Sequence, residues 1–312
     1  MTIPFSKDLA FEYGVAHPVA PKIRRIVAKN PSPFTLYGTG TYIVGEGDVA
    51  VIDPGPDDPA HIGAIAAELA GETLTHILVT HTHRDHSPGT KLLQAALGGT
   101  SYGFGPHGSG RPDSSGKIAP SGKTEPGGEV EEGGDHDFTP DQRLHDGDII
   151  EAAGFSIEAV HTPGHCSNHM CFRLREARVL FCGDHVMGWS TTVVAPPDGH
   201  MRTYMNSLRK LLGAGDTLYV PTHGPAIADP DPFVAAYIAH RQDRERQILD
   251  CLGRGIGGVF AMVEDMYAEL DPRLRPAAAY SVLAHLIHLV ETGRADSDGP
   301  PTLETTYAPG RR

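Results

Sequence analysis

Three histidines and one aspartate occupy a six-residue stretch of this 312-residue chain, His81-Thr82-His83-Arg84-Asp85-His86. Neutral imidazole and carboxylate are ligands that borderline divalent ions such as zinc prefer, and alternate residues of a turning segment can converge on one side. An apolar run at 75–79, typical of a buried strand, precedes the stretch, and Ser87-Pro88, which resembles a helix start, follows it. This context favours a metal site over a polar surface turn in a histidine-rich chain.

Three further residues of ligand type follow predicted strands in other parts of the chain. His165 follows a strand at 155–160, Asp184 follows one at 179–182, and His223 follows one at 218–220. Each residue alone would fit an ordinary loop. Because α/β sheets place their sites in the loops at the carboxyl ends of strands, the shared position predicts that these side chains join the histidine cluster.

The number of ligands is sufficient for two metal ions. We expect one site formed by His81, His83 and His165 and a second formed by Asp85, His86 and His223, with Asp184 bridging the two. Three protein ligands at each ion leave an open position for chemistry. Two Zn²⁺ ions are the expected cofactor, with Mn²⁺ or Fe²⁺ as alternatives.

Such a centre needs no serine or cysteine nucleophile. Paired ions lower the pKa of a bridging water towards about 7, which makes hydroxide available at neutral pH. Asp85 is the expected catalytic residue, because this carboxylate lies among the ligands and can orient the hydroxide and move a proton.

Several neighbouring residues have two interpretations. His161 and His169 are less favourable ligands than His165, which follows a Pro-Gly turn, and Asp53 either orients a ligand imidazole or caps a turn. Cys166 is interpreted as a buried thiol behind the metal site. At the pocket rim, substrate contact and structural packing are equally expected for four residues, His185, Trp189, His200 and Tyr204.

Composition limits the class of partner and the location. The formal net charge is −13, from 26 Lys and Arg against 39 Asp and Glu, which disfavours broad electrostatic capture of nucleic acid. The four cysteines form no CxxC pair, so a reducing, cytoplasmic compartment is expected. No apolar stretch approaches the roughly 18 residues of a membrane span, and residues 1–20 do not resemble a signal peptide.

The expected elements divide the chain into three parts. Residues 1–230 form the catalytic domain, with strands at 41–44, 49–52, 75–79, 155–160, 179–182 and 218–220 and helices at 61–70, 88–96 and 203–212. Within it, residues 104–146 are rich in Gly, Pro and Ser and are expected to form a long surface loop. Residues 231–295 favour a winged-helix-like unit, with helices expected at 232–252, 260–270 and 276–291 and a short ribbon. Residues 296–312 are expected to form a polar tail.

These motifs resemble those of metallo-β-lactamase-fold hydrolases. His81 to His86 matches the HxHxDH signature of that superfamily, and His165, Asp184 and His223 match its TPGH histidine, its GD aspartate and its last histidine. The resemblance implies a four-layered αββα sandwich of the α/β class with a dinuclear, usually zinc, centre. It says little about the substrate.

A closer resemblance, from Thr41 to about Arg294, is to the β-lactamase-like protein 2 subfamily. It rests on the segments 82–87, Gly183-Asp184, Met187-Gly188, 191–193, 204–208 and 223–225, and on the terminal helical unit. Members of that subfamily include a single-strand-specific endoribonuclease. The insertion at 104–146 is longer than usual there, and the arginines of the terminal unit are matched by a similar number of acids.

The leading hypothesis is a dinuclear zinc hydrolase that uses a metal-bridging hydroxide on a small ester, thioester or lactone. The alternatives are cleavage of single-stranded RNA and hydrolysis of glutathione thioesters, but neither a basic track nor stacking aromatics for RNA are conspicuous. β-Lactamase activity is disfavoured, because the resemblance places Asp184 in a branch similar to hydroxyacylglutathione hydrolases. A non-enzymatic alternative is a metal-bound sensor whose helical tail docks a partner. The complete ligand set argues against this alternative, because non-catalytic relatives are expected to have lost one or more ligands. The sequence predicts no oligomeric state.

Overall fold

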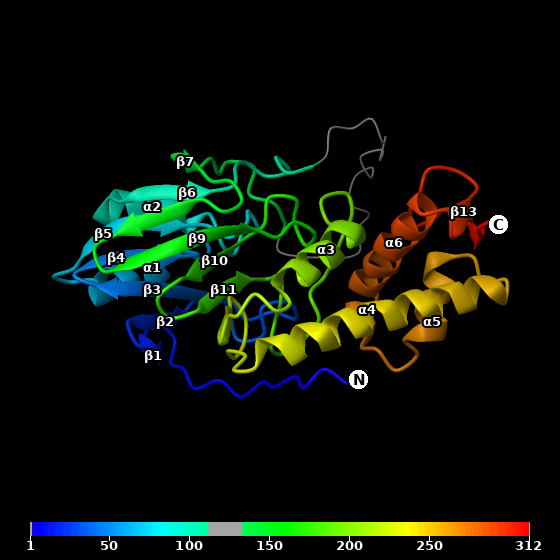
Figure 1. Cartoon of the computed structure of the whole chain (residues 1–312), viewed down its shortest axis with the longest axis horizontal. Helices are drawn as coiled ribbons and strands as arrows, with labels where there is room; N and C mark the ends of the chain where they lie inside the picture. The colour runs from blue at the N-terminus through cyan, green and yellow to red at the C-terminus, as the bar shows by residue number, and fades with distance from the viewer. Residues whose placement is uncertain (1, 112–132, 312) are drawn as a thin grey trace.

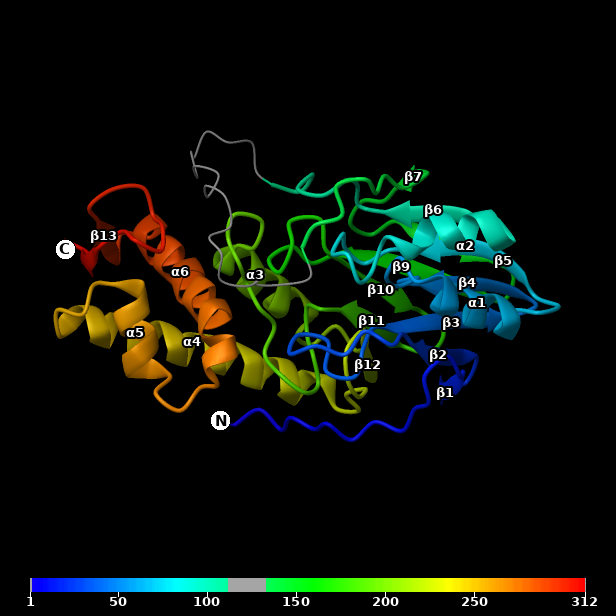
Figure 2. The same ribbon diagram turned by 180° about the vertical axis from the view of Figure 1, so that it is seen from behind.

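Two β-sheets lie face to face in the computed structural model, which describes residues 2–111 and 133–311 (Figures 1 and 2). The first sheet contains, in spatial order, β1 (His17–Ala20), β2 (Ile23–Val27), β3 (Gly40–Glu46), β4 (Asp48–Ile52), β5 (Thr73–Leu78), β6 (Thr100–Gly103) and β7 (Gln142–Arg143). The second has the order β12-β11-β10-β9-β8, from β8 (Ile149–Ala152), β9 (Phe155–His161), β10 (Met170–Leu174), β11 (Val179–Gly183) and β12 (Leu218–Pro221).

Successive side chains of the strands point to opposite faces of each sheet and so enter different layers of the core. In β3, Tyr42 and Val44 pack into the core between the sheets, whereas Ile43 packs outward into the core beneath the helices α1 (Pro59–Glu68) and α2 (Gly89–Leu97). In β11, Phe181 faces inward and Leu180 faces outward, towards α3 (Met201–Leu211) and the first half of α4 (Pro230–Gly253). The expected four-layered αββα sandwich is therefore confirmed.

Strand direction brings the site loops to one end of the sandwich. β5 lies parallel to β4, and β12 lies parallel to β11, so both pairs end on the same side. The loops that follow β4, β5, β9, β11 and β12 carry Asp53, His81, His165, Asp184 and His223.

A small helical unit follows at one end of the molecule (Figure 1). It consists of the second half of α4, α5 (Val259–Met266), the 3₁₀ turn η1 (Pro272–Leu274), α6 (Arg275–Glu291), β13 (Ala295–Ser297) and β14 (Tyr307–Pro309). This arrangement confirms the winged-helix expectation. α4 joins the two parts, because Tyr237 lies in the core of the second sheet and Ile248 in the core of the helical unit. None of the helices in the described ranges combines the length and apolarity that a membrane span requires.

Three expectations about the elements are wrong. Residues 296–312 are not a separate polar tail, since β14 pairs with β13 and Tyr307 is buried in the core of the helical unit. The helix expected at 260–270 ends at Met266, shortly before Pro272. Ser87 does not cap α2, because its hydroxyl donates to Asp135 instead.

The described flanks of the 104–146 segment run along the surface, as expected, and a few contacts anchor them to the sandwich. The backbone amides of Arg84 and Asp135 donate to Gly133 and Thr82, which ties this segment to the histidine cluster. Phe138 is buried, as is Leu144 in the core between the sheets. The expectation of a surface loop holds for these flanks, which are mostly exposed or half-buried turns and coil with the short strand β7, and the central part, 112–132, lies outside the described residues.

Candidate metal centre

The first three expected ligands meet at a triangle of ring nitrogens. His81 Nε2 lies 3.0 Å from His83 Nδ1, and His165 Nε2 lies 3.3 and 3.2 Å from the same two atoms. Nitrogens about 2.05 Å from one ion at tetrahedral corners are about 3.3 Å apart. The three imidazoles therefore fit one divalent ion.

The second triad has the same dimensions. Asp85 Oδ2 lies 3.3 Å from His86 Nε2 and 3.2 Å from His223 Nε2. The Thr39 hydroxyl donates to this oxygen over 3.0 Å and fixes the carboxylate. A second ion fits these three side chains equally well.

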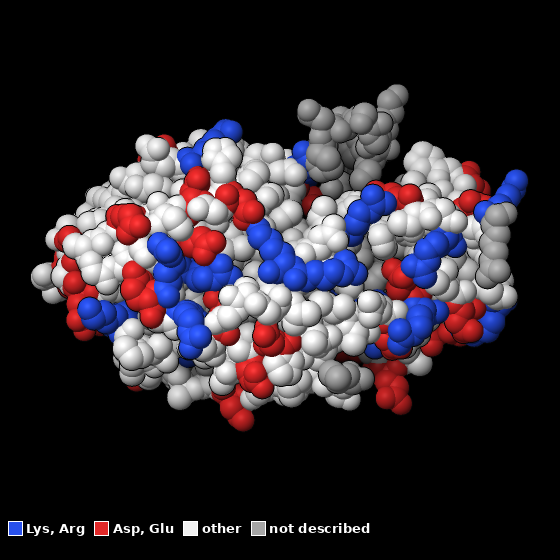
Figure 3. All heavy atoms as spheres, in the orientation of Figure 1, with Lys and Arg blue, Asp and Glu red and all other residues white. Residues whose placement is uncertain are grey.

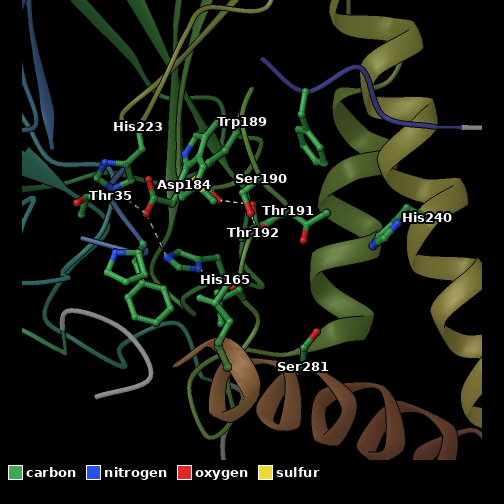
Figure 4. Close-up of a pocket in the computed structure, with 18 of the residues that line it drawn as sticks. Thr35, His165, Asp184, Trp189, Ser190, Thr191, Thr192, His223, His240 and Ser281 are labelled. Atoms are coloured by element: carbon green, nitrogen blue, oxygen red, sulfur yellow. Dashed lines mark hydrogen bonds and ion pairs between the residues drawn. The ribbon is translucent and has the colours of Figure 1, made fainter. Parts of the chain in front are cut away.

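Asp184 lies between the two triads. Its Oδ2 is 3.4 Å from His223 Nε2, 3.6 Å from His86 Nε2 and 3.8 Å from His165 Nε2 (Figure 4). Among the described residues, neither Asp184 Oδ1 nor His86 Nε2 has a hydrogen-bond partner, although both are buried. Buried polar atoms are normally paired, so these two atoms are suited to an ion. All seven expected ligands are thus brought together.

The other side of each ring is fixed by a hydrogen bond. His165 Nδ1 lies 2.8 Å from the Val193 carbonyl and His223 Nδ1 lies 3.2 Å from the Gly38 carbonyl, so each must donate. A donating Nδ1 leaves the lone pair on Nε2 for the ion. His81 Nδ1 lies 3.1 Å from the Thr80 hydroxyl and follows the same rule.

Asp53 fixes His86 and several backbone segments at once. Its Oδ2 lies 2.9 Å from His86 Nδ1 and accepts the hydroxyls of Thr80 and Thr222, while its Oδ1 accepts the Thr80 amide. The side chain is completely buried, and its backbone has a left-handed φ of 51°. Of the two interpretations of Asp53, the geometry favours the carboxylate that orients a ligand imidazole.

Electrostatics keep the carboxylates anionic. Burial raises the pKa of Asp85, but His86 and His223 outweigh burial and hold this pKa far below its usual value. His223 and His86 do the same for Asp184. Burial and the neighbouring imidazoles lower the pKa of His81, which favours the neutral form. The carboxylates in turn raise the pKa of His86, and that of His223 to about 10, so binding of an ion at the second triad must release the protons of these two rings.

The remaining candidates lie behind the ligands. His169 Nε2 accepts the backbone amide of Asp184 over 3.2 Å, and the His161 ring stacks on Phe104 with centroids 4.2 Å apart. Cys166 Sγ lies 3.1 Å from His83 Nε2, on the opposite side of that ring from Nδ1. Cys166 is thus a buried thiol that supports a ligand ring, as expected.

Comparison with known proteins establishes the family of this site. Residues 35–223 match the Metallo-beta-lactamase superfamily, and residues 259–300 match the Beta-lactamase associated winged helix domain. The chain belongs to the metallo-beta-lactamase superfamily. It is a hydrolase of that fold.

Relatives and solved structures match over most of the chain. The "Lactamase-like protein adaB" of Aspergillus niger is 30% identical, with 94% of this chain and 87% of that protein covered. The "Atrochrysone carboxyl ACP thioesterase dmxR1" of a Cryptosporiopsis species is 30% identical, covering 88% and 82%. The fold is similar to a beta-lactamase domain protein from Burkholderia ambifaria, with a TM-score of 0.75, 21% identity, and 97% and 96% of the two chains covered. A metallo-beta-lactamase family protein from Thermus thermophilus has a TM-score of 0.69, 24% identity, and 93% and 99% coverage.

In this superfamily member the ligands lie at the end of a cavity of about 440 Å³. Figure 4 shows His165, Asp184 and His223 together, with Trp189 beside them and His240 and Ser281 on the far side. Both parts of the chain form the walls. These include Phe34, Met187 and Trp189 from the sandwich, and Arg241, Arg244, Tyr267 and Leu274 from the helical unit.

Of the four expected rim residues, only Trp189 lines this cavity. His185 and Tyr204 are completely buried, and the Tyr204 hydroxyl donates to the His185 carbonyl. His200 caps the start of α3 and its Nε2 lies 3.0 Å from Glu291. Of the two interpretations of His185, Tyr204 and His200, the structure therefore favours structural packing over substrate contact.

Sequence reasoning missed the walls that α4 and α5 provide. Arg241 and Arg244 lie one turn apart on α4, and Tyr267 ends α5 with its ring 4.8 Å from the Arg244 guanidinium. Arginines spaced by three on a helix fit a solvated face equally well, so the pattern carries no specific signal. The sequence around Thr39 likewise carries no specific signal that this residue fixes Asp85.

Proposed function

We propose that the protein is a dinuclear zinc hydrolase of acyl thioesters. The observation that carries this proposal is the meeting of two ligand triads at Asp184, at the end of a cavity with apolar walls. Mn²⁺ and Fe²⁺ remain the alternative ions, because all three accept imidazole and carboxylate.

The thioester class is favoured by the cavity and by the relatives. Phe34, Met187, Trp189, Tyr267 and Leu274 provide apolar surface for an acyl chain. Three of the relatives are named atrochrysone carboxyl ACP thioesterases, and one of these, at 30% identity, is matched over 88% of the present chain. We infer that this protein also hydrolyses a thioester bond. The names of the relatives do not identify its acyl group.

Divalent ions bound at the two triads supply Lewis-acid polarisation of the thioester carbonyl and a water whose pKa is lowered towards about 7. Asp85 would orient the attacking water towards the thioester carbonyl carbon, where a C–O bond replaces the C–S bond and the thiol leaves with a proton from that water, while the Thr39 hydroxyl holds Asp85 Oδ2 in place. The apolar walls exclude bulk water from the acyl chain.

A substrate panel at matched metal loading tests this function. We expect acyl thioesters to be hydrolysed at least about tenfold faster, in kcat/KM, than the matching oxoester, a lactone, a phosphodiester or a cephalosporin. Labelled single-stranded RNA and an acylated glutathione belong in the same panel. Preferential cleavage of the RNA, with a steep fall in rate as salt rises, would establish the endoribonuclease alternative instead.

A further inference from the structure

A second cavity, of about 460 Å³, lies where α3, α4 and α6 meet. Its lining includes Arg202 and Arg209 of α3, Arg241 of α4, His285 of α6 and Arg294, and we call it the arginine cavity. Figure 3 shows Lys and Arg side chains gathered over α3 on this face of the molecule. The metal centre makes no use of this cavity, although Arg241 lines both cavities.

Positive charge exceeds negative charge in this cavity. Among the described residues of the lining, Glu245 is the single carboxylate, and it pairs with Arg294. Glu291, nearby, pairs with Arg202 over 3.0 Å. Within the described ranges, Arg209 and Arg241 have no carboxylate partner, since Arg209 donates to Asn206 and Arg241 to the Thr192 carbonyl and the Ser281 hydroxyl. An anion would balance the remaining charge.

The buried residues of the lining also lack hydrogen-bond partners. Arg241 and His285 are 3% and 2% exposed. Arg241 Nε and both ring nitrogens of His285 have no partner in the part of the chain that is described. Buried polar atoms in folded proteins are normally satisfied, and oxygens of a ligand in this cavity would satisfy these donors. Burial and Arg241 lower the pKa of His285, so its neutral ring offers one donor.

We propose that the arginine cavity binds the phosphate group of a phosphate ester. Guanidinium groups from α3, α4 and the segment after α6 surround one space, and their planar forks match the oxygens of phosphate better than a point charge does. The volume exceeds that of a phosphate ion alone and leaves room for the organic part of an ester. Two sources share this chemistry: the phosphopantetheine arm of a thioester substrate, which rests on the proposed function, and a separate phosphate metabolite.

Calorimetric titration of the metal-loaded 312-residue chain tests the site without turnover. The ligands are inorganic phosphate, 4′-phosphopantetheine and pantetheine, which lacks the phosphate. We expect 4′-phosphopantetheine to bind more tightly than pantetheine. The double variant Arg209→Gln/Arg294→Gln should raise the Kd of 4′-phosphopantetheine about tenfold or more. Both side chains are exposed at the cavity rim, so the substitutions remove positive charge without disturbing the hydrophobic core.

Two controls make the titration decisive. Arg246→Gln removes an exposed arginine of α4 that lies outside both cavities, and it should leave the Kd unchanged. Arg209→Gln alone should weaken binding in the same direction, and it breaks no ion pair, whereas Arg294 pairs with Glu245. Equal Kd values for the double variant and the unaltered protein, as expected for phosphate bound only at the metal centre, would overturn the proposal. Equal binding of pantetheine and its phosphate would overturn it as well.

Kinetics then identify the source of the phosphate. If the arm of the substrate occupies the arginine cavity, the double variant raises KM for an acyl-phosphopantetheine thioester but not for the acyl-pantetheine thioester. If a separate metabolite occupies it, neither KM changes while phosphate binding is still lost. Either result supports a phosphate-binding site in the arginine cavity. If none of the thioesters is hydrolysed, the proposed function is contradicted but the phosphate site is not.

Discussion

At the scale of single residues, every imidazole of the candidate centre is oriented by a contact behind it. His86 is held by Asp53, His165 by the Val193 carbonyl and His223 by the Gly38 carbonyl. A ring with its Nδ1–H engaged presents Nε2 as a ready ligand, and less rotational freedom is lost when the ion binds. Metal affinity therefore depends on residues that touch no ion.

Asp53→Asn tests this dependence. Asparagine can still accept the Thr80 amide through its oxygen but loses the charge that faces His86 Nδ1. We expect metal affinity to fall roughly 10- to 100-fold in competition with a chelator, with the fold retained. Asp57→Asn, at an exposed position nearby, is the matched control. Unchanged affinity in Asp53→Asn would contradict the orienting role.

The seven ligands could be predicted from the sequence because the strand-to-loop pattern places each at the carboxyl end of a strand. Their neighbours could not be predicted in this way. Tyr204 and His185 are close to Asp184 in the fold, but both are buried in packing beneath the second sheet. The sequence gives no side-chain direction, so it left substrate contact and packing equally open for the four rim residues, and the fold favours packing for three of them.

At the scale of elements, α3 lies directly against the turn that carries His165. Gly164 has a φ of 144°, and a Cβ added there would lie 2.3 Å from Tyr204 Cα. This contact is between backbones, so no side-chain rotation relieves it. The close approach sets the position of the His165 loop against the helix.

Gly164→Ala should consequently destabilise the protein more than an alanine at another glycine with a positive φ but open surroundings. Gly213, with a φ of 75° and nothing within 4 Å of an added Cβ, provides that comparison. We expect Gly164→Ala to lower the free energy of unfolding by about 2 kcal/mol or more beyond Gly213→Ala in urea titrations. Similar losses for both variants would show that the turn is free to move away from α3.

α1 provides a pH-dependent contribution to stability through His61. Burial lowers the pKa of this histidine to about 4, below the value of about 6.5 expected in the unfolded chain. The folded state therefore resists protonation of His61. Its contribution to stability is complete above about pH 6.5 and is lost progressively as pH falls from there to about 4.

His61→Gln should remove this part of the pH dependence. Urea unfolding at pH 7, 6 and 5 measures it as a smaller fall in the free energy of unfolding for the variant than for the unaltered protein. His145→Gln, which replaces an exposed histidine, should leave the slope unchanged. Parallel curves for His61→Gln and the unaltered protein would contradict the assignment.

At the scale of the whole molecule, the cavity exists because two parts of the chain face each other. The sandwich provides the ligands and Trp189, and the helical unit closes the opposite wall with Tyr267 and Arg244. Sequence patterns predicted both parts separately. They could not predict the shared wall, because it depends on how the long helix α4 places α5 and α6 over the site.

Tyr267→Ala tests the function of that wall. Loss of an apolar ring should lower kcat/KM for a long-chain acyl thioester by about tenfold and affect an acetyl thioester less, with metal content unchanged. Tyr280→Ala is the control, since Tyr280 packs in the helical unit without lining the cavity. An equal loss for both chain lengths would indicate that Tyr267 does not contact the acyl chain.

We infer that the seven side chains form one two-metal hydrolytic centre. Elemental analysis of protein purified without chelators tests this, on the unaltered chain and on His83→Ala, whose ring belongs to the first triad. We predict about two divalent ions per chain, mainly zinc, and about one or fewer in the folded but inactive His83→Ala variant. An unaltered protein that contains no tightly bound ion, or a His83→Ala variant that retains both, would contradict the account.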